Sequence, residues 1–161
     1  MNIRVATIND LDEILNVYSF AREFMAKTGN PHQWADGHPK KELLLSDFPL
    51  KRLYVLEDEK GIAGVFMFDT NPDPTYSYIE DGEWPNDEPY GVIHRIASMG
   101  RAKGVLKSAV EFAKLKVSNI RIDTHEDNKV MQTALSKLGF KRCGIIYLEN
   151  GDPRIAYQLV V

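Results

Sequence analysis

The middle of the chain, residues 92–124, reads VIHRIASMGRAKGVLKSAVEFAKLKVSNIRIDT. The apolar run at 92–97 predicts a strand, and an apolar stripe at helical spacing predicts a helix over 105–117. A second strand is predicted over 120–124. A strand, a crossover helix and a second strand form a unit in which the two strands are expected to be parallel, so the sequence predicts an α/β sheet.

The turn between this strand and helix carries Arg101-Ala102-Lys103-Gly104. The first backbone N–H groups of a helix have no partner within the helix and attract anions such as pyrophosphate. Two cations in the turn favour the same interpretation. An ordinary surface turn also often contains Arg, Lys and Gly, so at this level both interpretations stand.

Strand and helix signals alternate along the rest of the chain, without internal repeats. In the first half we predict a strand at residues 3–5, a helix that begins within residues 7–10 and is terminated by residues 29–31, a helix over about 40–46, and hairpin strands at 53–56 and 62–68. An irregular segment follows over 69–91. In the second half we predict a helix from about 127 that ends at 139, and hairpin strands at 143–148 and 154–160. The turn after the first strand is Thr7-Ile8-Asn9-Asp10 rather than a glycine-rich loop, which excludes a dinucleotide-binding domain of the Rossmann type.

Composition limits the classes of function. The 161 residues predict one compact domain over 1–161, and 43% hydrophobic with 27% charged residues is typical of a soluble globular protein. We expect a cytoplasmic protein, because no apolar run is long enough for a membrane span and no secretory signal is visible. A net charge of −3 predicts no general attraction to nucleic acid or anionic membranes. Cys143, the single cysteine, allows neither an internal disulfide nor a cysteine metal cluster and is expected to pack as a small apolar residue.

The order of these elements, together with three motifs near the C-terminus, resembles the GCN5-related N-acetyltransferases (GNAT), which transfer an acetyl group from acetyl-CoA to an amine. The motifs are Asp123-Thr124-His125-x-x-Asn128-x-x-Met131, Leu138-Gly139-Phe140-x-x-Cys143-Gly144 and Gly151-x-x-Arg154-x-Ala156-Tyr157, and the front half adds Gln33-Trp34 and Asp47 before Leu53-Tyr54-Val55. The resemblance implies an α/β (α+β) fold with a central mixed, mostly antiparallel twisted sheet flanked by helices. Its fourth and fifth strands would be parallel and splayed apart to admit the cofactor.

The resemblance implies acetyl-CoA as the co-substrate and no metal. It implies a pantetheine contact by the backbone of Ile96, Ala97 and Ser98, and a pyrophosphate site made by Arg101, Ala102, Lys103, Gly104, Val105, Leu106 and Lys107. Asn128 and Met131 would contact the cofactor from the other side, although Asn128 also suits a helix N-cap and the two roles can coexist. The family pattern has Gly or Ala where this chain has Leu106, a departure that would narrow or reposition the cradle.

The expected chemistry is direct attack of a neutral amine on the thioester, which requires a base, an oxyanion donor and a proton for the thiolate. His94 lies on the strand before the turn and is the first candidate for the base, although a packed strand histidine is an equal interpretation. Glu83 and Asp81 are rivals that would act through water. His125 is a further rival, whose place just beyond a strand suggests a structural or cofactor-side role.

The proton donor is less defined. Many family members have a tyrosine one helical turn before the Gly-Phe pair, where this chain has Leu135, which cannot donate a proton. Tyr147 and Tyr157 offer hydroxyls, but each is also explained as a packed strand aromatic, and water is another donor. By resemblance, a backbone N–H of the strand that ends at Ala97 would stabilise the oxyanion.

The predicted acceptor follows from an acidic segment. Between Lys60 and His94 there is no Lys or Arg, but there are seven Asp or Glu residues interleaved with aromatic ones. If this segment borders the acceptor site, its field and its rings favour the primary amine of a small molecule, and acceptors that are phosphorylated or rich in carboxylates are less favoured. A solvated acidic loop is the alternative. The residues predicted to bind the acceptor are Trp34, Tyr78, Asp81 and Trp84, with a core position as the alternative for Trp34.

Two function classes remain. One is an N-acetyltransferase that acetylates a small-molecule amine, and the other is a non-catalytic acyl-CoA-binding or sensor domain, which Leu106 and Leu135 keep open. The sequence is compatible with both a monomer and a homodimer.

Overall fold

A computed structural model describes all residues from Met1 to Val161. Seven strands form one sheet: β1 (Asn2–Val5), β2 (Leu53–Asp58), β3 (Gly61–Asp69), β4 (Gly91–Ser98), β5 (Asn119–Thr124), β6 (Lys141–Tyr147) and β7 (Pro153–Val160). Four α-helices accompany it: α1 (Leu11–Lys27), α2 (Lys41–Leu50), α3 (Val105–Lys114) and α4 (Lys129–Lys137). Short 3₁₀ turns lie at Ile8–Asp10, Ala35–Gly37 and Pro74–Tyr76. The predicted α/β class with a mixed sheet is confirmed.

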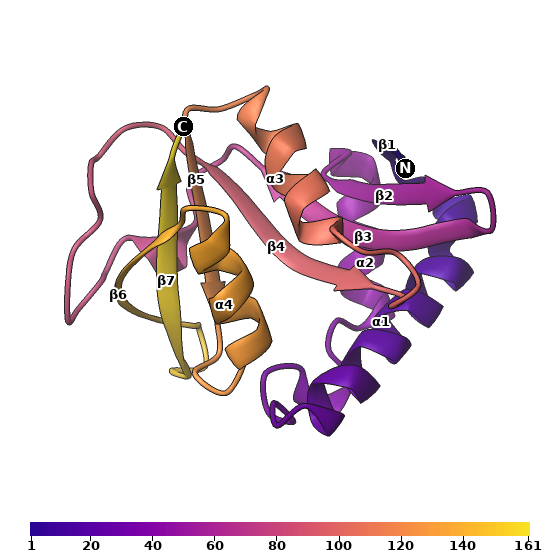
Figure 1. The fold of residues 1–161 in the computed structure, drawn as a ribbon, viewed down its shortest axis with the longest axis horizontal. Coiled ribbons are helices and arrows are strands. Elements are labelled where there is room, and N and C mark those ends of the chain that lie inside the picture. Colours follow the sequence, from indigo (N-terminus) through magenta and orange to yellow (C-terminus); the bar gives the residue numbers. More distant parts are fainter.

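The sheet runs in the order β1-β2-β3-β4-β5-β7-β6. Every neighbouring pair is antiparallel except β4 and β5, which are parallel and pair only at Gly91 with Ile120 and at Val92 with Arg121. Beyond these positions β4 turns away from β5, as Figure 1 shows. The predicted splay of the fourth and fifth strands is therefore present.

The main differences from the predicted elements lie at helix ends. Helix α2 continues beyond Ser46 to Leu50 and contains Pro49, which has no N–H to donate to the carbonyl of Leu45, and the helix ends one residue later. Helix α3 ends at Lys114 instead of Val117, because the N–H groups of Lys116 and Val117 both donate to the carbonyl of Ala113 and form a tight turn. Apolar periodicity continues through such a turn and does not mark it.

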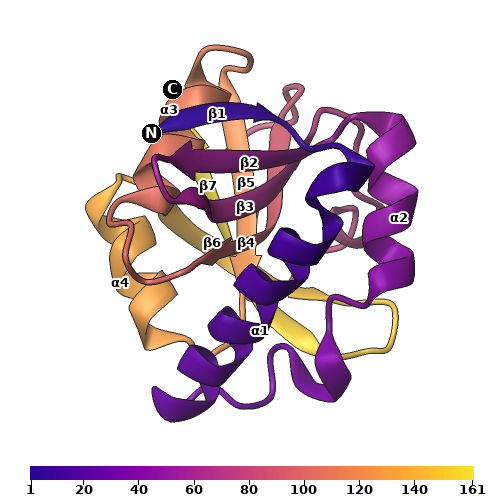
Figure 2. The same ribbon diagram turned by 90° about the vertical axis from the view of Figure 1, so that its right-hand side faces the viewer.

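Helices cover both faces of the sheet. Helices α1 and α2 lie on one side and α3 and α4 on the other (Figure 2). Fully buried core side chains are contributed by α1 and α2 on the first face, namely Ile14, Tyr18 and Leu44, and by α3 and α4 on the second, namely Ala109, Val110 and Leu135. Because each helix buries its apolar stripe against the strands, the splay between β4 and β5 lies within a well-packed frame.

Strand β4 contains a bulge in the middle of its length. Val65 pairs with Ala97 but Met67 pairs with His94, so β4 holds one extra residue between these positions. Arg95, in the bulge, has a φ of +50°, which is unusual for a residue with a side chain. Its carbonyl accepts a 2.8 Å hydrogen bond from the hydroxyl of Tyr18 on α1.

The side chain of Arg95 is anchored by Asp47 of α2. The Asp47 carboxylate is 0% exposed and binds Arg95 and also Arg52, whose Nε lies 2.7 Å from Oδ1. The ion cluster therefore fixes α2 to the bulge in β4.

We expect Asp47→Ala to lower the free energy of unfolding by about 3 kcal/mol, because it leaves the largely buried guanidinium of Arg95 without a carboxylate and removes the closer of the two carboxylates that bind Arg52. Urea denaturation monitored by circular dichroism measures this loss. The control is Glu111→Gln, which removes the exposed partner of Lys114 and should cost about 0.5 kcal/mol or less. Equal losses in the two variants would contradict the role given to Asp47.

Candidate active site

Two cavities lie between α1, the bulged part of β4 and α4. The larger has a volume of about 850 Å³ and the smaller about 270 Å³. Both are lined by Met25, Ile96 and Met131, so they meet at the splay of the sheet. A two-part site of this kind can hold one ligand in each part with their reacting groups at the junction.

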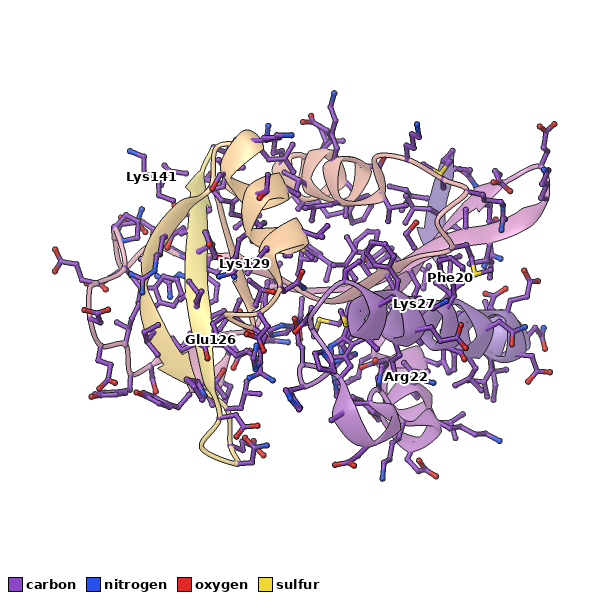
Figure 3. The ribbon with its side chains drawn as sticks, turned by 60° about the horizontal axis from the view of Figure 1, so that its bottom comes forward. Phe20, Arg22, Lys27, Glu126, Lys129 and Lys141 are labelled. Atoms are coloured by element: carbon purple, nitrogen blue, oxygen red, sulfur yellow. The ribbon has the colours of Figure 1, made fainter.

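The smaller cavity is mainly apolar. It is lined by Phe20, Phe24, Ala97, Ser98, Val105, Leu106, Asn128 and Val130, among others. The ring of Phe20 lies close to Gly100 in the turn after β4, and Figure 3 shows it on the side of α1 that faces this turn. An elongated, weakly polar chain suits this cavity.

The smaller cavity reaches the N-terminus of α3. Gly104 at this end has a φ of +76°, no side chain caps the helix and its first turn has no acidic residue. A Cβ built on Gly104 would meet nothing within 4 Å, so the space before the helix is open. The side chain of Leu106 packs against the core and does not close this space. The first N–H groups of α3 are therefore available to an anion.

The cations of this turn differ in their surroundings. Arg101 donates from Nε and Nη2 to the carboxylate of Asp58, at 3.0 Å each, which joins the turn to the β2–β3 hairpin. Lys103 and Lys107 are exposed and form no ion pair. The positive charge free to meet an anion is thus that of the two lysines.

Asn128 caps helix α4 and also lines the smaller cavity, in line with the two roles that the sequence left open. Its Oδ1 accepts a 3.0 Å hydrogen bond from the N–H of Met131, which makes it the N-cap of α4. Its Nδ2 donates to Gln33 at 3.0 Å, and its side chain also lines the smaller cavity. Its capping role is observed, and its position allows contact with a ligand.

His94 lines the larger cavity between two carboxylates. Its Nε2 lies 2.7 Å from Oδ2 of Asp73, and its Nδ1 lies 3.8 Å from Oδ2 of Asp123. Burial opposes ionisation of Asp73, but hydrogen bonds from His94 and Thr75 outweigh it and lower the pKa of Asp73 to about 2. An ionised carboxylate only accepts hydrogen bonds, so Nε2 carries the proton and Nδ1 is the ring atom that can accept one.

The Asp123 carboxylate is held in place from behind. The hydroxyl of Tyr76 donates to its Oδ2 at 2.7 Å, and the Tyr76 ring packs against that of His94 with centroids 5.9 Å apart. Tyr76 is fully buried, and burial followed by the neighbouring Asp123 raises its pKa well above the usual value. The phenol is therefore a fixed hydrogen-bond donor that keeps Asp123 facing the cavity.

The acidic segment contributes less to the cavity than its composition predicts. Of residues 69–91, only Asp73 and Thr75 line the larger cavity. Glu83 and Asp81 are exposed and line neither cavity, and Asp81 faces Arg142 at 3.5 Å. Glu83 and Asp81 were both candidates for the base, but neither lies in the cavity beside His94.

The aromatic residues of this segment also point elsewhere. Trp84 stacks on the guanidinium of Arg121, 3.9 Å from its ring centroid, and donates from Nε1 to the carbonyl of Tyr76. Tyr78 is exposed and donates to Glu80. Neither Trp84 nor Tyr78 lines a cavity, so the prediction that they bind the acceptor finds no support. Trp34 does line the larger cavity, between the rings of Tyr18 and His38.

None of the seven tyrosines lines either cavity. Tyr147 is exposed and donates its hydroxyl to Glu80, and Tyr157 is buried in the core. Leu135 is fully buried in the same core. His125 accepts a 3.0 Å hydrogen bond from the N–H of Asp127 and also lies outside both cavities. Proton donation by a phenol in the cavities is thus unsupported.

Among the charged residues of the larger cavity that received no individual role from the sequence are Asp73, Asp123, Arg95 and Arg154. Asp123 is the second-last residue of β5, at the splay, and a polar residue at the end of a parallel strand is a usable signal. Arg154 is the single charged residue of a largely apolar strand, which is a second signal. Nothing local marks Asp73 among seven similar acidic residues.

No cluster of three or more His, Cys, Asp or Glu side chains has an arrangement that would hold a metal ion. The helices include none with the length and apolar character needed to cross a bilayer. Cys143 is buried, and burial raises the pKa of its thiol.

Comparison with solved structures finds proteins with the same fold. An acetyltransferase of the GNAT family from Streptococcus agalactiae is 31% identical over 99% of this chain and 95% of its own, with a TM-score of 0.87. GNAT-family acetyltransferases from Listeria monocytogenes and Bacillus cereus are each 22% identical over 99% of this chain and 94% and 96% of their own, with TM-scores of 0.72 and 0.63, and share the fold. Comparisons with protein-family models and with curated proteins find no match.

The hydrogen bonds to Asp73 predict a pH-dependent loss of stability. The pKa of its carboxyl is depressed in the folded protein, so its stabilisation is complete above about pH 4 and is lost as the pH falls towards 2. We expect this contribution to be about 1 to 2 kcal/mol. Urea denaturation at pH 6, 4, 3 and 2 should show a gap between the wild type and Asp73→Asn that closes at low pH. A gap that stays constant over this range would contradict the assignment.

Proposed function

Because this chain belongs to the GNAT family of acetyl-CoA-dependent acetyltransferases, we propose that it transfers the acetyl group to a primary amine of a small molecule by direct attack. The observation that carries the proposal is the pair of joined cavities. The smaller, mainly apolar one reaches the N-terminus of α3, and the larger one contains His94 between Asp73 and Asp123. Membership of the family favours transfer over the non-catalytic alternative.

The smaller cavity and the start of α3 suit acetyl-CoA, which supplies the acetyl thioester when bound. The N–H groups of α3, with Lys103 and Lys107, would bind the pyrophosphate. The backbone of Ile96, Ala97 and Ser98 would pair with the amide groups of the pantetheine arm, since β5 does not pair with this part of β4. Asn128 and Met131 would line the opposite side.

His94 would act as the base. Its Nδ1 accepts a proton from the ammonium group, and the charge on the ring is stabilised by Asp73 through Nε2. The neutral amine nitrogen then bonds to the thioester carbonyl carbon as the carbon–sulfur bond breaks. A backbone N–H of β4 beside the bulge would stabilise the negative charge on the carbonyl oxygen. The nitrogen loses its second proton as the amide forms, and water would pass this proton to the departing thiolate.

Binding of acetyl-CoA is the first prediction of this proposal. At about 100 times its Kd, acetyl-CoA should add about 2.7 kcal/mol and raise the unfolding midpoint by about 5 to 10 °C, while NADH and ATP should not. Gly104→Val should abolish most of this shift, because valine disfavours the left-handed backbone and its side chain enters the space before α3. Thermal unfolding with each ligand measures both effects.

Gly151→Val is the matched control for this experiment. Gly151 has a φ of +89° and open space around it, as Gly104 has, but it lies in the β6–β7 turn. The control variant should unfold at a lower temperature and keep the acetyl-CoA shift. If both variants keep the shift, the N-terminus of α3 does not bind the pyrophosphate.

The second prediction concerns transfer. Release of free thiol from acetyl-CoA should accelerate when primary amines are added, and His94→Gln should lower kcat by about 100-fold with little change in the KM for acetyl-CoA. His125→Gln, outside both cavities, is the control and should behave as the wild type. A binding shift without thiol release by any amine would support the non-catalytic alternative instead.

A further inference from the structure

Arg154, near the start of β7, is a buried charge without an ion pair. The residue is 6% exposed and lines the larger cavity. Its guanidinium donates to two backbone carbonyls, those of Pro153 at 2.8 Å and Gln33 at 3.4 Å, and no carboxylate oxygen lies within 4.0 Å. Burial lowers its pKa, an effect that the more distant Asp123 and Asp152 oppose. A buried guanidinium is costly unless it gains an anionic partner.

The surroundings of His38 show that Arg154 belongs to a cationic side of the cavity. Burial lowers the pKa of His38, and the positive charges of Arg95, Arg154 and Arg22 lower it further. Arg22 donates to the carbonyl of His38 at 3.3 Å, and Figure 3 shows it on a different side of α1 from Phe20. The Nε of Arg95 is buried and has no hydrogen-bond partner.

The same cavity thus offers two recognition surfaces of opposite charge. Asp73 and Asp123 beside His94 suit an ammonium group. Arg154 suits an anion, and the planar fork of a guanidinium matches the two oxygens of a carboxylate in particular. With a volume of about 850 Å³, the cavity can hold both groups of one small molecule.

We propose that the acceptor is an amine that also carries a carboxylate, a molecule of the amino-acid class, and that Arg154 binds this carboxylate while the amine lies at His94. This inference rests on the proposed acetyl transfer and narrows its substrate class. It also explains the burial of an arginine without an ion pair, because the substrate supplies the missing partner.

The wild-type protein provides the first test. Thiol release is measured with matched acceptors: amino acids, the corresponding carboxamides and the corresponding decarboxylated amines, with rates corrected for the fraction of neutral amine. We expect kcat/KM to be at least about tenfold higher for the best amino acid than for its carboxamide and its amine. Equal rates for the three would overturn this inference and leave the proposed acetyl transfer standing. Absence of thiol release with every acceptor would overturn both.

Variants of Arg154 provide the second test. Arg154→Gln should raise the KM for the best amino acid by about 10- to 100-fold, leave the KM for acetyl-CoA unchanged and hardly affect the carboxamide, whereas Arg154→Lys should restore part of the binding. The matched control is Arg142→Gln, an exposed arginine on the neighbouring strand β6 outside both cavities. Equal KM increases for amino acid and carboxamide would contradict the proposal. If Arg154→Gln does not fold, the proposal is tested by the rates of the wild-type protein with the matched acceptors.

Discussion

The short parallel contact between β4 and β5 is the constraint on which the site depends. The two strands pair only at Gly91 and Val92 of β4, and the rest of β4 has no strand partner on that side. Unpaired backbone groups in a protein interior are costly, so the gap favours a ligand that brings amide groups of its own. The bulge at Arg95 helps to turn the strand away, and the hydroxyl of Tyr18 and the carboxylate of Asp47 hold it from the other face. Contacts within the protein therefore stabilise the splay.

Most of the fold could be predicted from the sequence because its signals are local. Apolar periodicity, the glycine after α4 and the Asn-Gly turn each act within a few residues, and the elements they predict are present. The end of α3 could not be predicted, since it depends on which N–H groups share the carbonyl of Ala113. Within the site, His94 and Trp34 were found, and both line the larger cavity.

The acidic segment shows why composition alone did not locate the acceptor site. Tyr76, Trp84 and Tyr90 turn inward, where they pack on the sheet and around the guanidinium of Arg121. Most of the acidic side chains therefore face solvent. Asp73 is an exception because its carboxylate accepts hydrogen bonds from His94 and Thr75. Which acidic residue of such a segment reaches a cavity depends on tertiary packing, and a single sequence does not contain that information in a readable form.

The net charge of the chain is an equally poor guide to the charge within the cavity. The acidic segment without cations favoured a simple cationic acceptor, yet a buried arginine acts on a ligand more strongly than many exposed carboxylates, because water screens it less. A cavity with both signs of charge also bears on turnover. Acetylation removes the positive charge of the amine, so the product loses its attraction to Asp73 and Asp123 and keeps only the carboxylate contact with Arg154. The proposed arrangement thus binds the substrate at two points and the product at one, which favours product release.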